Sequence, residues 1–239
     1  MIQFFFKMIQ IAYTNSNCSD LWNVFQKQNQ KYTTIPLYMI SDKVVDCIDD
    51  DKLFIYNNEN DYYNVWVEAL KKFDSDYFIY LQEDFILYDK ANDEKLNKCL
   101  EFLKQNPNYS FIRLIKSGRL REKRIFDNLY EIESSNPNIF SMQATIWRTK
   151  DYISLMEKVK DRKWLENDKY PKEMLKMGMK GLYYYDGEGK RGENHYDSSI
   201  YPYIATALVR GKWNTSEYNN ELVSILSYFD IDKNKRGTI

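Results

Sequence analysis

The sequence has no long apolar run, no excess of charge of one sign and few cysteines, and each shortage excludes a class of protein. Near the start, Gln3, Lys7 and Gln10 interrupt the apolar residues, and no stretch there approaches the roughly 18 apolar residues of a membrane span. We therefore expect neither a transmembrane segment nor a secretory signal. The 34 basic and 35 acidic residues give a formal net charge of −1, which argues against a nucleic-acid partner bound through a bulk positive field.

Three cysteines and one histidine limit the chemistry further. Cys18, Cys47 and Cys99 are far apart, match no zinc spacing and cannot all pair within one chain, which favours a reducing compartment. We expect a cytoplasmic protein, or one held at a membrane surface by a partner. The single histidine, His195, is accompanied by no nucleophile motif such as Gly-x-Ser-x-Gly, so nothing here resembles a Ser-His-Asp or Cys-His enzyme.

What the sequence does contain is an alternation of short apolar runs with amphipathic stretches, which predicts an α/β fold with a mixed, mainly parallel sheet flanked by helices. At 239 residues we expect a single domain. Residues 116–124 and 187–192 read as loops, and 233–236 as a frayed tail. Strands are expected at 8–13, 35–40, 53–56, 77–82, 110–115 and 139–147, and helices at 21–30, 61–73, 92–105, 150–160, 161–177 (broken near Pro171) and 221–229.

One apolar stretch, residues 76–87, is interrupted by two adjacent carboxylates, Glu83 and Asp84, directly after a predicted buried strand. Carboxylate oxygens at a strand end suit Mg²⁺ or Mn²⁺, and such a cation can bridge phosphates. We therefore take Asp84 as the first metal ligand, with Glu83 as its neighbour or alternate. The ordinary alternative is a strand end with a solvated acidic turn, because acids are mostly exposed.

Three segments follow one another in an informative order. The first, residues 9–16 (IQIAYTNS), is a leading strand that runs into a polar loop. The second, 78–85 (FIYLQEDF), carries the acidic pair, and the third, 140–148 (FSMQATIWR), is followed by 164–166 (WLE). In this order they resemble the GT-A type of glycosyltransferase, a class of nucleotide-sugar-dependent enzymes, over roughly residues 8–215. The chain departs from the usual Asp-x-Asp motif of that class, since it carries Gln-Glu-Asp at 82–84.

The resemblance implies a nucleotide-binding half at about residues 1–115, an acceptor-binding half at about 116–215 and a C-terminal helix and tail at 216–239. It implies transfer of a sugar from a nucleotide-diphosphate donor, a UDP-sugar, to a saccharide or other hydroxyl acceptor. A divalent cation (Mn²⁺ or Mg²⁺) or fixed basic groups would stabilise the pyrophosphate leaving group. A carboxylate would accept the proton of the attacking hydroxyl, with Glu166 as the candidate and Asp168 as the second choice.

The remaining candidate residues follow from the same resemblance. Each also has an ordinary alternative: a glycine cap at Gly211 would leave Lys212 merely exposed, a lone histidine is usually packed, and a tryptophan often fills the core. Donor-binding candidates are Tyr13, Thr14, Asn15, Asp42, Glu83 and Lys212; metal candidates are Asp84 and His195; acceptor-binding candidates are Gln143, Trp147 and Trp164.

Two other functional classes fit the same residues. A non-catalytic carbohydrate-binding protein on this scaffold would keep sugar binding after the substitution Asp84→Asn, whereas the transferase would lose metal-dependent transfer. A metal-dependent phosphate-handling hydrolase that uses Glu83 and Asp84 would release phosphate without needing an acceptor.

Overall fold

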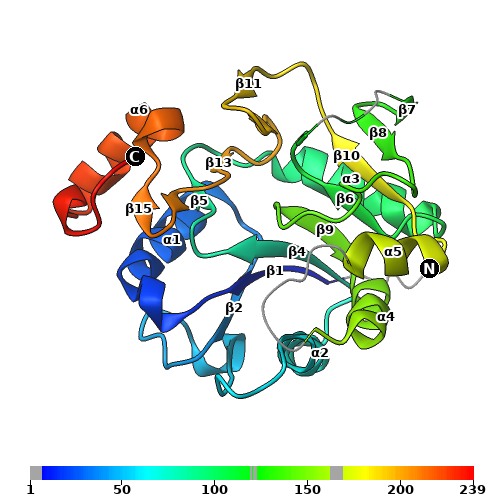
Figure 1. The fold of residues 1–239 in the computed structure, drawn as a ribbon, viewed down its shortest axis with the longest axis horizontal. Helices are drawn as coiled ribbons and strands as arrows, with labels where there is room; N and C mark the ends of the chain where they lie inside the picture. Colours follow the sequence, from blue (N-terminus) through cyan, green and yellow to red (C-terminus); the bar gives the residue numbers. More distant parts are fainter. Residues whose placement is uncertain (1–6, 119, 121–122, 162–168) are drawn as a thin grey trace.

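Nine strands form one mixed sheet in the computed structural model, which describes residues 7–118, 120, 123–161 and 169–239 (Figure 1). The strand order is β3-β2-β1-β4-β9-β6-β10-β8-β7. The four strands β3, β2, β1 and β4 are parallel to one another, and β9 is antiparallel to both its neighbours. Strands β6 and β10 are parallel, and β8 and β7 add an antiparallel edge. The bounds are β1 Met8–Tyr13, β2 Leu37–Ser41, β3 Leu53–Ile55, β4 Tyr77–Gln82, β6 Phe111–Arg113, β7 Lys123–Phe126, β8 Leu129–Ile132, β9 Thr145–Arg148 and β10 Gly181–Tyr184.

Helices cover both faces of this sheet (Figure 1). Helices α2, α4 and α5 lie together on one face, and α1 and α3 lie on the other. The helix bounds are α1 Ser19–Tyr32, α2 Tyr62–Phe73, α3 Asp93–Gln105, α4 Thr149–Val159, α5 Lys169–Lys176 and α6 Thr215–Tyr228, with short 3₁₀ turns η1 Ser16–Cys18, η2 Asp50–Lys52 and η3 Lys233–Lys235. Three two-stranded pairs complete the description: β5 Ile86–Leu87 with β13 Tyr203–Ile204, β11 Lys190–Arg191 with β12 His195–Tyr196, and β14 Leu208–Val209 with β15 Lys212–Trp213.

The core lies on both faces of the central strands β1 and β4, which read as apolar runs because helices cover both sides. Towards α2 and α4, Trp66 stacks on Tyr80 with ring centroids 5.2 Å apart, and Tyr152 meets Trp66 edge-on at 5.3 Å. Towards α1, the buried Gln10 pairs with Asn29 through two hydrogen bonds of 2.9 and 3.0 Å. This pairing satisfies a polar side chain inside the sheet and fixes α1 against β1.

The strands expected at 8–13 and 77–82 are confirmed residue for residue as β1 and β4, and the expected fold class is confirmed with them. These strands position the site described below. The helices expected at 61–73, 92–105 and 150–160 are confirmed as α2, α3 and α4, each displaced by at most one residue at an end.

Several other expectations need correction. The strand expected at 139–147 is shorter in the structure, where β9 covers Thr145–Arg148. Strand β10 and the hairpin formed by β7 and β8 were not predicted from the sequence. Helix α5 continues through Pro171 without a break, and the earlier part of that expected helix lies outside the described residues except for Asp161. The expected tail at 233–236 is an ordered 3₁₀ turn, and residues 190–191 of the expected glycine-rich loop pair with β12.

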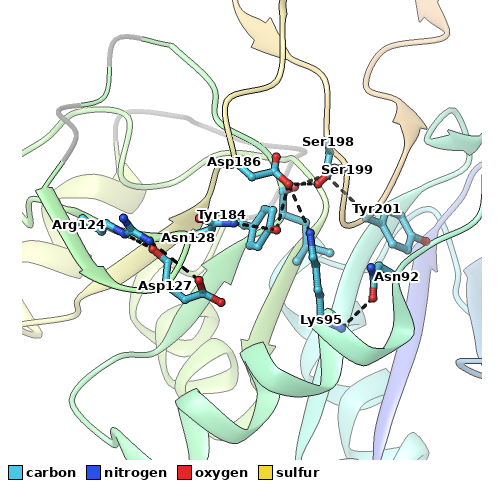
Figure 2. A network of polar contacts seen from close by, with 11 residues as sticks. Asn92, Lys95, Arg124, Asp127, Asn128, Tyr184, Asp186, Ser198, Ser199 and Tyr201 are labelled. Carbon is cyan, nitrogen blue, oxygen red and sulfur yellow. Dashed lines mark hydrogen bonds and ion pairs between the residues drawn. The ribbon is translucent and has the colours of Figure 1, made fainter.

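A polar network attaches the long connection after β10 to helix α3 (Figure 2). Asp186 lies at its centre and accepts hydrogen bonds from the Tyr184 hydroxyl at 3.1 Å and from the Ser199 hydroxyl. Lys95 of α3 lies 3.5 Å from the same carboxylate and approaches the Tyr184 ring. Nearby, the Ser198 hydroxyl donates to a backbone carbonyl at the end of β6 at 2.6 Å. The segment that carries His195 is therefore held from both ends.

Candidate functional site

A cavity of about 650 Å³ opens at the carboxyl ends of β1 and β4. From β1 the chain continues to β2 on one side of the sheet, and from β4 it continues to β6 on the other, so the cavity lies at a topological switch point. Open α/β sheets bind their ligands at such points. The lining comes from the loops after β1 and β3, the end of β4 and the β14–β15 hairpin, and comprises Tyr13, Asn15, Asn17, Cys18, Tyr56, Asn58, Asn60, Tyr62, Gln82, Glu83, Asp84, Leu208, Arg210 and Gly211.

Glu83 and Asp84 follow β4 directly and form the acidic side of the cavity. Burial and then the neighbouring charge of Asp84 raise the pKa of Glu83 to about 8. Burial raises the pKa of Asp84 to about 7, although the Leu208 N–H donates to it at 3.5 Å. Within the described parts of the chain, no lysine or arginine forms an ion pair with either carboxylate. A bound cation would stabilise the ionised form of the pair.

Aromatic rings and asparagine amides supply other parts of the lining. Tyr13, at the end of β1, stacks on Tyr56 with centroids 5.4 Å apart and an interplanar angle of 19°. It meets Tyr62 edge-on at 5.1 Å. Tyr13 also stacks on Trp66 with centroids 6.0 Å apart, so the edge of its ring is the part open to a ligand. Amides offer both a donor and an acceptor to base edges. The asparagines in the lining are Asn15, Asn17, Asn58 and Asn60, and Gln82 adds a fifth amide.

Two of the predicted donor-binding residues support the loops and do not line the cavity. Asp42 accepts hydrogen bonds of 2.7 Å from both the backbone N–H and the hydroxyl of Ser16, and one of 3.4 Å from Asn58. Burial opposes its ionisation, but these hydrogen bonds hold the pKa of Asp42 below its usual value. Thr14 is buried, and its hydroxyl donates to the Ile40 carbonyl at 3.0 Å. The oxygens of Asp42 are thus already occupied by protein donors.

The β14–β15 hairpin brings a cation to the cavity that the sequence reasoning missed. Val209 pairs with Lys212, and the two residues between them have positive φ, 52° at Arg210 and 78° at Gly211. Two such residues make the two-residue turn that matches the strand twist. The turn places Arg210 in the lining and leaves Lys212, the predicted donor-binding lysine, exposed outside it. The sequence signal that could have located Arg210 is the Arg-Gly dipeptide, because its two residues form the turn of the hairpin.

The structure places His195 and Gln143 against each other, outside the cavity lining, and does not bring His195 to Asp84. The hydroxyl of Tyr203 accepts from the Ala144 N–H at 3.2 Å and donates to Gln143 Oε1 at 2.7 Å. Gln143 Nε2 therefore donates to His195 Nε2, 3.1 Å away, which puts the imidazole proton on Nδ1. Burial lowers the pKa of His195, in agreement with a neutral ring.

The predicted acceptor-side residues separate into two groups. Trp147 is only 2% exposed and packs on Phe111 with centroids 4.5 Å apart, so it is a core residue with no ring face for an acceptor. Trp164, Glu166 and Asp168 lie outside the described residues, so their roles stay predictions.

The acidic pair fits a hard divalent cation. Mg²⁺ and Mn²⁺ prefer oxygen ligands, and Mg²⁺ is commonly held by one or two carboxylates together with water and substrate phosphates. The described residues contain no group of three His, Cys, Asp or Glu side chains that could hold a metal ion. Glu83 and Asp84 would therefore be the protein ligands, and other oxygens would complete the shell.

No family model matches this chain, and no curated protein is similar to it in sequence. Among solved structures, S. aureus TarS 1–349 is 11% identical, with a TM-score of 0.53 over 96% of this chain and 68% of that chain. Another structure of S. aureus TarS is 14% identical, with a TM-score of 0.50 over 96% of this chain and 41% of that chain.

A CMP:2-keto-3-deoxy-manno-octonic acid synthetase complexed with CTP is 10% identical, with a TM-score of 0.47 over 74% of this chain and 89% of that chain. This last similarity is too low to carry an argument. At these identities the TarS similarity shows the fold alone, a GT-A-like, mainly parallel sheet flanked by helices in a single domain. In the described parts of the chain, no helix is both long and apolar enough to span a membrane.

Proposed function

We propose that the protein is a nucleotide-sugar-dependent glycosyltransferase of GT-A type that moves a sugar from a nucleotide-diphosphate donor, a UDP-sugar, to a saccharide or other hydroxyl acceptor. The observation that carries the proposal is the pair Glu83 and Asp84, which lies in a cavity at the switch point with raised pKa values and no ion-pair partner among the described residues. Together with the aromatic and amide side of the cavity, it fits a nucleotide whose phosphates carry a divalent cation.

The roles of the residues follow from their positions. The exposed edge of the Tyr13 ring, whose faces meet Tyr56 and Trp66, would contact the base, and the asparagine amides would meet the edge of the base or the ribose. Arg210 would meet the diphosphate, because it is the cation of the lining. Glu83 and Asp84 would hold Mn²⁺ or Mg²⁺, which when bound supplies positive charge to the diphosphate of the leaving UDP.

We assign the acceptor side to residues 116–215, with Glu166 or Asp168 as the base that accepts the proton of the attacking hydroxyl. The cysteines that the structure describes are unpaired, which supports a cytoplasmic location or a peripheral one at a membrane.

The test is thermal unfolding with a panel of nucleotides and nucleotide-sugars, with and without Mn²⁺. A ligand at 100 times its Kd stabilises the native state by about 2.7 kcal/mol, which raises the Tm of a chain of this length by about 5 °C. We expect a shift for a uridine diphosphate compound that grows with Mn²⁺ and is lost in Asp84→Asn. Asp46→Asn, an exposed carboxylate outside the cavity lining, is the matched control.

The outcomes separate the candidate functions. Sugar transfer to an added acceptor supports the transferase, whereas phosphate release without an acceptor supports the hydrolase. Sugar binding that survives Asp84→Asn without turnover supports the non-catalytic binding protein. The absence of a shift for every nucleotide in folded protein would contradict a nucleotide site at this cavity.

A further inference from the structure

One side chain near the end of the sequence, Arg236, joins two walls of the cavity. Its Nε donates to Asp20 at 2.7 Å, and its Nη2 donates to the other oxygen of that carboxylate and to the Asn17 carbonyl at 3.1 Å. Its Nη1 donates to the Gly211 carbonyl at 3.4 Å. Asn17 and Gly211 both line the cavity, whereas Arg236 does not. Arg236 thus connects the loop after β1 to the β14–β15 hairpin.

The backbone around Arg236 supports the same hairpin. The Trp213 N–H donates to the Gly237 carbonyl at 3.0 Å, and the Ile239 N–H donates to the Trp213 carbonyl at 3.0 Å. Residues 237–239 therefore run beside β15. This matters because each strand of the hairpin has only two residues, and an isolated pair of such strands is marginally stable at best.

The turn at the hairpin tip depends on this support. Arg210 has a φ of 52°, a left-handed conformation that is unfavourable for residues other than glycine. Such residues persist where the surrounding structure holds them. In the described chain Arg210 forms no ion pair, so its charge remains available to an anion, whereas the charge of Arg236 is already opposed by Asp20.

We propose that Arg236 is a positioning residue that holds Arg210 at the cavity, so that affinity for a nucleoside diphosphate depends on a side chain outside the lining. The proposal rests on the proposed function, in which Arg210 meets the diphosphate. Arg236 acts through the Gly211 carbonyl, directly beside Arg210, and through the Asn17 carbonyl in the loop after β1.

The test is a double-mutant cycle on UDP affinity, measured calorimetrically with Mn²⁺ present. We expect Arg210→Ala to weaken binding about tenfold and Arg236→Ala to weaken it about fivefold, whereas the double variant binds no more weakly than Arg210→Ala alone. Asp20→Asn should act in the same direction as Arg236→Ala. Arg124→Ala is the control, because Arg124 is exposed and bonds within its own turn to Asp127. If the double variant instead loses UDP affinity by the product of the two single losses, the proposal is overturned.

A second readout needs no ligand. Hydrogen exchange at the backbone amides of 208–213 should quicken in Arg236→Ala while exchange in β1 and β4 stays unchanged. Unchanged exchange at the hairpin would overturn the proposal even if UDP affinity fell. If wild-type protein binds no UDP but the hairpin exchanges faster in the variant, the proposed function fails and the positioning role of Arg236 stands.

Discussion

The substitution Asp84→Asn should make the protein more stable at pH 8 in the absence of metal. Burial raises the pKa of Asp84 from an ordinary 3.8 to about 7, so the folded state retains a proton that the unfolded state releases. The unfolding free energy therefore falls as the pH rises from about 4 through 7. Below pH 4 both states are protonated and the effect disappears.

The size of the effect follows from the same values. The difference between about 7 and 3.8, at about 1.4 kcal/mol per pH unit, is an upper limit of about 4 kcal/mol. Because the side chain is partly exposed to the cavity, we expect about half of this, or about 2 kcal/mol, after screening by water. For a chain of 239 residues this raises the Tm by about 4 °C.

The assay is thermal unfolding followed by circular dichroism, in EDTA, at pH 5 and pH 8. Asp84→Asn should exceed wild type by about 4 °C at pH 8 and by much less at pH 5, where Asp84 is protonated and resembles asparagine. Asp46→Asn should differ from wild type at neither pH. If Asp84→Asn is less stable than wild type at pH 8, or if its gain does not depend on pH, the carboxylate is not electrostatically strained and the reasoning is refuted.

The remaining predictions concern other parts of the site and the core. Mn²⁺ must displace protons from both Glu83 and Asp84, so its affinity should rise by nearly a hundredfold per pH unit around pH 6, where both are protonated, and by less than about tenfold per unit around pH 8; a Kd independent of pH in calorimetry would contradict this. Tyr13→Leu should weaken UDP binding by up to about tenfold and Tyr13→Phe much less; if Tyr13→Leu binds UDP as tightly as wild type, the ring makes no contact with the base. Trp147→Ala should lower the free energy of unfolding in urea by about 3–5 kcal/mol, because Trp147 fills the core. Trp147→Phe should leave the KM for the acceptor unchanged. A raised KM in Trp147→Phe would show that Trp147 does contact the acceptor. His195→Gln should leave Mn²⁺ affinity within about twofold of wild type, and a loss would show that His195 reaches the metal.

The local pattern of apolar and polar residues was sufficient to predict the two strands β1 and β4, the second of which carries the acidic pair at its end. The runs at 8–13 and 77–82 are bounded by polar residues and lie buried between helices, so the sequence alone locates both strands and the pair at the end of β4. The short strand β10 was missed because a run of four residues between turns gives too little periodicity to recognise.

The rest of the site depends on contacts between distant residues. Arg210 reaches the cavity only because the hairpin folds back on the end of β4, and this placement leaves no periodic signal in the sequence. Similarly, the strand expected to start at 139 starts at 145, and buried Arg113 accounts for part of the difference because it binds the carbonyls of Asn138 and Ile139 at 2.8 and 3.1 Å. Side chains that attach loops across the fold cannot be read from spacing.

The lining of the cavity, drawn from residues 13–18, 56–62, 82–84 and 208–211, has a consequence for biosynthesis. A nascent chain that has emerged from the ribosome only as far as β10 already carries the aromatic side and the acidic pair, but it still lacks the hairpin. Because a domain generally folds as a unit, the complete lining forms only once the hairpin has emerged. Arrested chains of increasing length should therefore retain a nucleotide only when residues 208–213 have left the ribosome, so that nucleotide retention would report when the last wall has formed.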